Sequence, residues 1–337
     1  WQLLRPRSAM LENNRMTMKA IVINGCCSAE QLQVSDIPVP QAKPGWVLVK
    51  IYAAGLNHSE ALLRTHEADN DYINTPIVPG IECVGEIADA SDSHFAEGDR
   101  VIALMGGMGR SFNGSYAEYA LLPTKNVFKV STTLDWLSLA AVPETYFTAF
   151  GSLTECLLLQ GGDVLLVRGA TSTVGQAAIQ LGKAMGATVV AAARRENSFA
   201  QLTSIGADHC VIDDGLISEQ TLPDRPNKVL ELIGPKTLRD SLLMVSRPGY
   251  VCQTGLLGNV FTVPQFDAIK YIPNGVFLTG FFSNFPSQAV IDRLMDIIEN
   301  AHISPLYKRV FSLDQIVEAH TLLESGGAGG KLILKIR

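Results

Sequence analysis

The groups best placed for chemistry lie in a turn of small residues, 169–175, which follows an apolar run starting at Val164. A buried strand, a tight turn and a helix in this order form the first unit of a dinucleotide-binding βαβ fold. Such a turn directs backbone N–H groups and a helix N-terminus at a pyrophosphate, and only small residues allow so close an approach. Ser172 and Thr173 stand where glycines are commonest, so a buried strand, turn and helix that bind nothing is the alternative. The residues that we expect to contact the pyrophosphate are Ala170, Thr173, Val174 and Gly175.

A second apolar run, 187–193, ends where an NAD-specific site places Asp or Glu against the ribose 2′-hydroxyl. Here Arg194 and Arg195 follow instead, and the first carboxylate is Glu196. A carboxylate would repel a 2′-phosphate, whereas a guanidinium binds it in a bidentate fashion. We therefore expect NADPH as the cofactor, with Arg194 at its 2′-phosphate; solvated loop arginines are the alternative.

Composition indicates a globular enzyme of the cytoplasm. The chain has 337 residues, enough for two domains, of which 47% are hydrophobic and 18% charged. A net charge of −6 without a basic run argues against nucleic acid or an anionic membrane as partner. No apolar stretch is long enough to cross a bilayer. The six cysteines are scattered without the spacing of a zinc site or a disulfide framework, as expected for free thiols in a reducing compartment.

The pattern along the chain predicts two domains. Residues 18–142 contain short strands separated by Gly, Pro and Asn, which indicates a β-rich domain. In residues 143–284 strands alternate with helices, as in a doubly wound parallel sheet. Residues 285–337 are too few for a domain and are expected to pack on the first one. Residues 1–17 have no apolar period, and we interpret them as an extension or cloning remnant. The strands expected in the parallel sheet lie near Val164, Thr188, Cys210, Val229, Gly249 and Val276.

The expected elements outside the parallel sheet are as follows. Strands are expected at 18–23, 45–52, 82–87, 98–104, 116–121, 127–130, 308–311 and 332–336, and helices at 289–300 and 313–323.

Several separated motifs resemble the medium-chain dehydrogenase/reductase superfamily, and within it the zinc-independent quinone oxidoreductase branch to which zeta-crystallin belongs. The resemblance extends from Met18 to the C-terminus. It implies an α/β fold, with a Rossmann doubly wound parallel sheet for NADP(H) and a β-rich GroES-like catalytic domain. The motifs are 55–64, 79–87, 98–101, 139–143 with 147–150, 318–320 and 329–334.

The chain departs from the zinc alcohol dehydrogenases of this superfamily at two positions. From the resemblance, a zinc enzyme of this superfamily needs a Cys where Asn57 stands and a His where Ile81 stands. Neither can be dispensed with, because catalytic zinc takes three protein ligands. The cysteine-rich structural zinc lobe is also missing from residues 101–116. His58 and Glu82 could bind a metal, but isolated residues of these types are more often structural. We therefore expect no metal.

Without a Lewis acid, hydrogen-bond donors must polarise the acceptor while the cofactor supplies hydride. A conjugated quinone or enone suits this chemistry because it spreads the incoming charge to an oxygen. The resemblance places Asn57 and Ser59 near the nicotinamide, and Thr148 is a third candidate donor. Asn57 could instead cap a turn, and Ser59 could only cap the following helix.

Further site residues are expected from the resemblance. His58 could touch the pyrophosphate, Thr254 and Gly255 should lie near the nicotinamide ribose, and Lys331 could reach the cofactor. A surface histidine and a charged strand start are the alternatives for His58 and Lys331. Leu62 replaces a tyrosine that several quinone reductases carry, which leaves the pocket more apolar. The residues proposed to line the substrate pocket are Tyr52, Leu62, Phe281 and Phe282, although such aromatics are often simply core.

The sequence therefore favours NADPH-dependent reduction of quinones or α,β-unsaturated carbonyls by metal-free hydride transfer to a small molecule. An enoyl-thioester reductase acting on CoA or carrier-protein substrates is one alternative. A non-catalytic NADPH-binding protein is the other. The resemblance also implies a homodimer, often formed through the last Rossmann strand, for which 276–281 is apolar enough.

Overall fold

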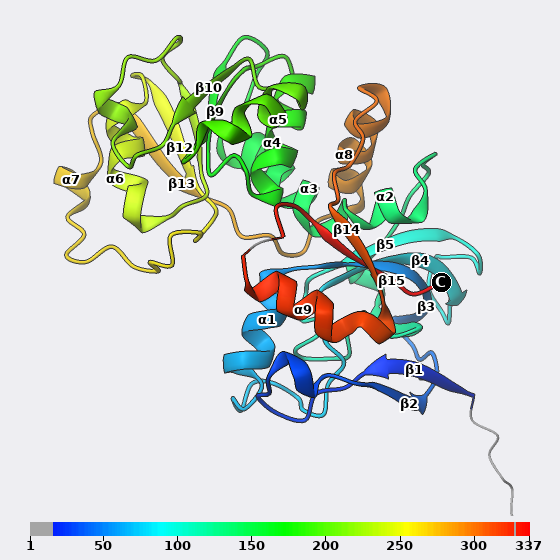
Figure 1. Cartoon of the computed structure of the whole chain (residues 1–337). Helices are drawn as coiled ribbons and strands as arrows, with labels where there is room; N and C mark the ends of the chain where they lie inside the picture. Colours follow the sequence, from blue (N-terminus) through cyan, green and yellow to red (C-terminus); the bar gives the residue numbers. More distant parts are fainter. Residues whose placement is uncertain (1–15, 327) are drawn as a thin grey trace, which may run out of the picture.

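The computed structural model describes residues 16–326 and 328–337, and these form two lobes (Figure 1). Most of the extension expected at residues 1–17 lies outside the described residues. Thr17, which was assigned to that extension, is the first residue of strand β1 (Thr17–Ile21) and pairs with Pro38 of β2 (Val34–Pro38). Across the described chain, no helix is both long and apolar enough to cross a membrane.

One lobe contains a six-stranded sheet in the order β10-β9-β8-β11-β12-β13, in which every pairing is parallel. This order is that of a Rossmann fold, so the expected doubly wound sheet is confirmed, with all six strands at the expected places. The strands are β8 (Val164–Arg168), β9 (Thr188–Ala193), β10 (His209–Ile212), β11 (Lys228–Glu231), β12 (Gly249–Gln253) and β13 (Val276–Gly280). The helices that follow them in this lobe are α4 (Thr173–Ala184), α5 (Phe199–Ser204), α6 (Pro235–Met244) and α7 (Ala268–Tyr271).

The other lobe contains a seven-stranded sheet in the order β14-β15-β3-β4-β5-β7, with β6 paired to β3. The C-terminal segment joins this sheet, because β15 pairs antiparallel with β3 in the first half of the chain. The strands are β3 (Trp46–Leu56), β4 (Glu82–Asp89), β5 (Arg100–Leu104), β6 (Tyr119–Pro123), β7 (Val127–Lys129), β14 (Arg309–Ser312) and β15 (Leu332–Lys335). The helices around it are α1 (His58–Leu62), α2 (Trp136–Ala140) and α9 (Ile316–Glu324).

Some boundaries differ from those expected. β3 continues to Leu56 because its neighbours on both sides, β4 and β15, keep it bonded. β6 begins at Tyr119 and not at Tyr116, because the backbone just before it bonds to β1 instead: the Ile21 N–H donates to the Tyr116 carbonyl and the Glu118 N–H to the Lys19 carbonyl. The helix expected from Leu313 starts as a short 3₁₀ turn before α9.

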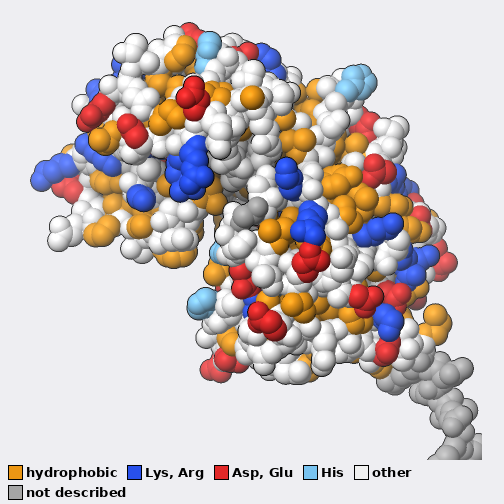
Figure 2. Space-filling model, viewed as in Figure 1, with side chains coloured by type: hydrophobic (Ala, Val, Ile, Leu, Met, Phe, Trp, Pro, Cys, Tyr) orange, Lys and Arg blue, Asp and Glu red, His pale blue; other side chains and the backbone are white. Residues whose placement is uncertain are grey.

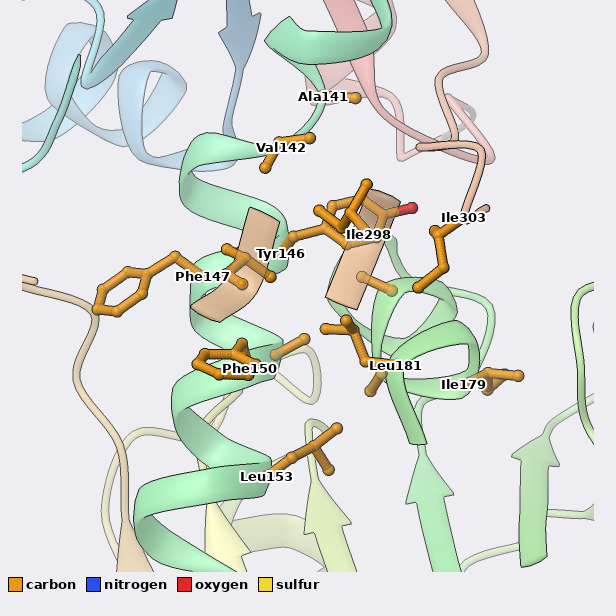
Figure 3. Close-up of a cluster of buried hydrophobic side chains, with 14 of the residues drawn as sticks. Ala141, Val142, Tyr146, Phe147, Phe150, Leu153, Ile179, Leu181, Ile298 and Ile303 are labelled. Atoms are coloured by element: carbon orange, nitrogen blue, oxygen red, sulfur yellow. The ribbon is translucent and has the colours of Figure 1, made fainter. Parts of the chain in front are cut away.

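Helix α3 (Pro143–Gly151) joins the two lobes, and its buried side chains pack with those of α4 and α8 (Gln288–Asn300) (Figure 3). Pro143 at the first position starts the helix, because its missing N–H has no partner to lose there. The same apolar cluster includes Val84 and Ile102 of one lobe and Leu165 of the other. A continuous core therefore holds α3 rigidly between the two lobes.

Candidate functional site

The turn after β8 has the close packing expected of a pyrophosphate site. Gly169 has φ +84°, which favours glycine, and a Cβ at Gly175 would come 2.5 Å from the Gly169 carbonyl oxygen. Ser172 caps α4 by accepting the Gly175 N–H at 3.1 Å. The N–H groups of Thr173 and Val174 open the helix and have no partner within it. Backbone donors and a helix N-terminus therefore converge on a place where an anion can bind.

Arg194 directly follows β9, the strand next to β8, so it lies at the same carboxyl edge of the sheet as the turn. The residue is exposed. Arg195 and Glu196 after it are exposed as well. The guanidinium thus stands in solvent at the edge of the dinucleotide site, where a negatively charged group of a ligand could reach it.

A cavity of about 190 Å³ lies between the two lobes, beside the start of α4. Its lining includes Thr173 from the start of α4, and Lys331 and Gly330 from the segment before β15. Figure 2 shows the groove between the lobes. Two residues that the sequence assigned separately to the cofactor, Thr173 and Lys331, therefore share one cavity.

Lys331 lies within a cluster of polar side chains in the lobe of the seven-stranded sheet. Its side chain is buried, and its Nζ donates to Asn57 Oδ1 at 2.7 Å and to Glu82 Oε1 at 2.5 Å. The pairing register explains the contact, because Leu332 of β15 lies opposite Leu56 of β3 and brings Lys331 beside Asn57. The Asn57 Nδ2 donates in turn to Glu82 Oε1 at 2.8 Å. The amide of Asn57 is thus held between an ammonium and a carboxylate.

Glu60, in α1, is the next member of this cluster. Asn57 caps α1, and its backbone N–H donates to Glu60 Oε2 at 2.7 Å, while the Ile81 N–H donates to Glu60 Oε1 at 3.1 Å. Burial raises the pKa of Glu60 to about 7, an effect that the nearby Lys331 partly offsets. Asn57 is therefore the N-cap of this helix, and Ser59, for which capping was considered, lies inside it.

Glu144, on α3, extends the cluster toward the Rossmann lobe. Its backbone N–H donates to Glu82 Oε2 at 2.7 Å, and its Oε1 accepts the hydroxyls of Thr148, at 3.3 Å, and Ser283. Burial raises the pKa of Glu144 to about 8. This carboxyl group is therefore a neutral acid near pH 7.

A chain of hydroxyl groups leads from α3 to the end of β12. The Ser152 hydroxyl donates to the Thr148 carbonyl at 2.7 Å and lies 2.9 Å from Thr254 Oγ1. Gly255 follows, and a Cβ there would come 2.3 Å from the Leu232 carbonyl oxygen. The carboxyl ends of β11 and β12 thus approach α3 closely, and Thr148 and Thr254 belong to one polar network.

The remaining predicted residues lie around or away from this network. Tyr52 stacks on Trp136 at 4.3 Å and donates to Glu86, so it is not brought to Asn57. Phe281 packs edge-on against Phe147 of α3, the helix that joins the two lobes. The other three differ in exposure: His58 is exposed, Leu62 is half-buried and Phe282 is 77% exposed.

Sequence reasoning missed Glu60 and Glu144, and considered Glu82 only as a weak metal ligand. Each is a single carboxylate next to apolar residues, as in Val142-Pro143-Glu144, and such isolation in an apolar run is a signal of a buried acid. Their mutual contacts come from three elements far apart in the chain. The cluster itself therefore becomes visible only in the fold.

The Rossmann sheet, the small-residue turn and the polar site beneath it define a nucleotide-dependent oxidoreductase. The chain matches the alcohol dehydrogenase GroES-like domain family over residues 43–132 and the zinc-binding dehydrogenase family over residues 205–334. It is 29% identical to human quinone oxidoreductase over 313 residues, which cover 89% of this chain and 92% of that protein.

Solved structures agree. The quinone oxidoreductase from Coxiella burnetii is 26% identical, with a TM-score of 0.79 over 96% of this chain and 100% of that one. An NAD-dependent alcohol dehydrogenase, also 26% identical, has a TM-score of 0.83 over 95% of this chain and 100% of that one. The chain belongs to the medium-chain dehydrogenase/reductase superfamily, whose oxidoreductases use a nicotinamide cofactor, and its sequence relatives include quinone oxidoreductases.

Proposed function

We propose that this protein reduces quinones or α,β-unsaturated carbonyls with NADPH, by hydride transfer that needs no metal. The observation that carries the proposal is the position of Lys331. Its ammonium lies between Asn57 and Glu82. A built-in cation thus stands among the polar groups of the site.

The residues present do not fit catalytic zinc. Asn57 offers an amide oxygen that already accepts from Lys331, and Ile81 has no ligand atom. A zinc ion beside Glu82 would have to displace the ammonium 2.5 Å from that carboxylate, at a cost in repulsion and lost hydrogen bonds. Within residues 16–326 and 328–337, no group of at least three His, Cys, Asp or Glu side chains is placed to hold a metal.

The residues do fit a nicotinamide dinucleotide, and the exposed Arg194 favours the phosphorylated form. The turn before α4 offers backbone donors for the pyrophosphate, and Thr254 and Gly255 border the place expected for the nicotinamide ribose. The cofactor supplies the hydride when bound. The turn before α4 binds and orients it.

This assignment divides the chain into a catalytic domain, 18–142 with 285–337, and a cofactor domain, 143–284.

We also propose a homodimer that forms through β13. That strand is the edge of the six-stranded sheet, and Phe277 on it is 49% exposed. Phe261 and Ile269, in the segment before it, are 66% and 91% exposed. An unpaired edge beside exposed apolar side chains is the kind of surface that a second copy covers.

Two measurements test the proposal. Nicotinamide fluorescence titrations compare NADPH with NADH, and the decay of absorbance at 340 nm follows NADPH oxidation by 1,4-benzoquinone or 9,10-phenanthrenequinone. We expect tighter binding of NADPH and rapid oxidation. Binding without turnover on any quinone or enone would refute the reductase assignment, and equal affinity for both cofactors would refute the role of Arg194.

A further inference from the structure

The site contains more buried acid than its cation can balance. Glu60, Glu82 and Glu144 share the single ammonium of Lys331, and Glu60 and Glu82 are fully buried. Buried carboxylates that share a site cannot all ionise, because each charge disfavours the next. Glu82 has the ammonium at 2.5 Å, whereas Glu60 and Glu144 accept hydrogen bonds from backbone N–H and hydroxyl groups.

Glu60 is closed off from any substrate. Its two oxygens accept the backbone N–H groups of Asn57 and Ile81, and the residue has no exposed surface. Glu144 differs in both respects. The residue as a whole is partly exposed, but its Oε2 atom is buried and has no hydrogen-bond partner among the described residues. An ionised oxygen without a partner would be costly at a buried position, whereas a neutral carboxylic acid is tolerated.

A hydroxyl group is bonded directly to the carboxyl group of Glu144. The Ser283 hydroxyl donates to its Oε1, whereas the Thr148 hydroxyl lies 3.3 Å from the same atom and donates to the Glu144 carbonyl oxygen at 2.6 Å; Thr148 and Ser283 are each 8% exposed. Ser283 directly follows Phe282, which is 77% exposed. A hydroxyl can accept one proton while it gives up another, so the Ser283 hydroxyl can carry a proton between Glu144 and a bound molecule.

We propose that Glu144 is the proton store of this reductase and passes a proton through the hydroxyl of Ser283 to the oxygen of the reduced acceptor. The inference rests on the proposed function. In the step, hydride from NADPH supplies both electrons to a quinone, and NADP⁺ is formed. The acceptor oxygen takes the proton of a hydroxyl, the hydroxyl takes the proton of Glu144, and the carboxylate regains a proton from water.

The test compares Glu144→Gln with Glu155→Gln, which changes an exposed glutamate in the next helical segment. General acid catalysis contributes about 10²–10⁴-fold, so we expect kcat with 1,4-benzoquinone to fall by at least about 10²-fold in Glu144→Gln. NADPH affinity should stay at the wild-type value, because the nucleotide turn is unchanged. Glu155→Gln should behave as wild type.

The pH profile separates proton supply from a structural role. The wild-type kcat should fall as pH rises through about 8, where Glu144 loses its proton, and this limb should be absent in Glu144→Gln. The Ser283 hydroxyl lowers the pKa of Glu144 by bonding to the carboxylate, so Ser283→Ala should move the limb to higher pH. Circular dichroism checks the fold of each variant. If Glu144→Gln does not fold, the pH profile of Ser283→Ala tests the inference in its place.

Wild-type kcat and an unchanged alkaline limb in Glu144→Gln would overturn the inference, as would an unmoved limb in Ser283→Ala. Either result would leave the reductase assignment standing. Failure of the wild-type protein itself to oxidise NADPH with any quinone or enone would remove both the assignment and the inference.

Discussion

Replacing Lys331 by Met should show how strongly the central cation holds the site together. The side chain is 2% exposed, and its ammonium is bonded to Glu82 and Asn57. Methionine has similar length and no charge, so the change removes the cation without leaving a large cavity. Glu82 would stay buried with only the Asn57 amide and the Glu144 N–H as donors.

Loss of one partner from a buried ion pair typically costs about 3–5 kcal/mol, because the other charge is left uncompensated. The two remaining donors still solvate Glu82, so we expect a decrease in the free energy of unfolding of about 3 kcal/mol, the lower end of that range. Equilibrium unfolding in urea, followed by circular dichroism, measures this quantity.

Two further variants make the result specific. Lys335→Met removes an exposed lysine from β15, the strand that directly follows Lys331, and should change stability little. Adding Glu82→Gln to Lys331→Met removes the stranded charge and should restore part of the loss. If Lys331→Met is as stable as Lys335→Met, the ammonium does not balance the buried carboxylates and the reasoning is refuted.

Three other perturbations follow from the structure. Arg194→Ala should weaken NADPH binding about tenfold and leave NADH binding unchanged. A hydrogen bond to a charged group contributes about 1.5–3 kcal/mol, and the exposure of Arg194 favours the lower end of that range. Fluorescence titration measures both affinities, and equal losses would contradict the assignment of Arg194 to the 2′-phosphate. Gly175→Ala should cost about 1–3 kcal/mol and weaken both cofactors, because its Cβ would lie 2.5 Å from a backbone oxygen. Gly161→Ala, whose Cβ would have 3.6 Å of clearance, should melt like wild type, and equal melting temperatures for the two variants would show that the turn is not tightly packed. Phe277→Asp should give a monomer in sedimentation analysis if β13 is the dimer edge, and an unchanged mass would exclude that edge.

The sequence predicted the fold well because its signals are local. Each strand of the Rossmann sheet is a short apolar run bounded by turn residues, and the alternation with helices implies parallel pairing. The turn at 169–175 was visible for the same reason, since its small residues follow a strand and precede a helix. Register is less local, so the start of β6 was placed too early.

The acid cluster could not be predicted, because its contacts depend on three-dimensional closure. Lys331 meets Asn57 only through the pairing of β15 with β3, which are separated by most of the chain. Asn57 was expected as a free donor to the acceptor, yet its amide is engaged by Glu82 and Lys331. Glu144 was not selected, since a carboxylate on a helix is usually solvated and its burial comes from Ser283 and β4.

The most direct test of the central claim is the rate of NADPH oxidation with 1,4-benzoquinone before and after exhaustive chelation, with the metal content of the same sample measured. We expect an unchanged rate in protein that holds no stoichiometric metal, because Lys331 already supplies the cation of the site. A rate that disappears on chelation and returns when zinc is added would contradict it.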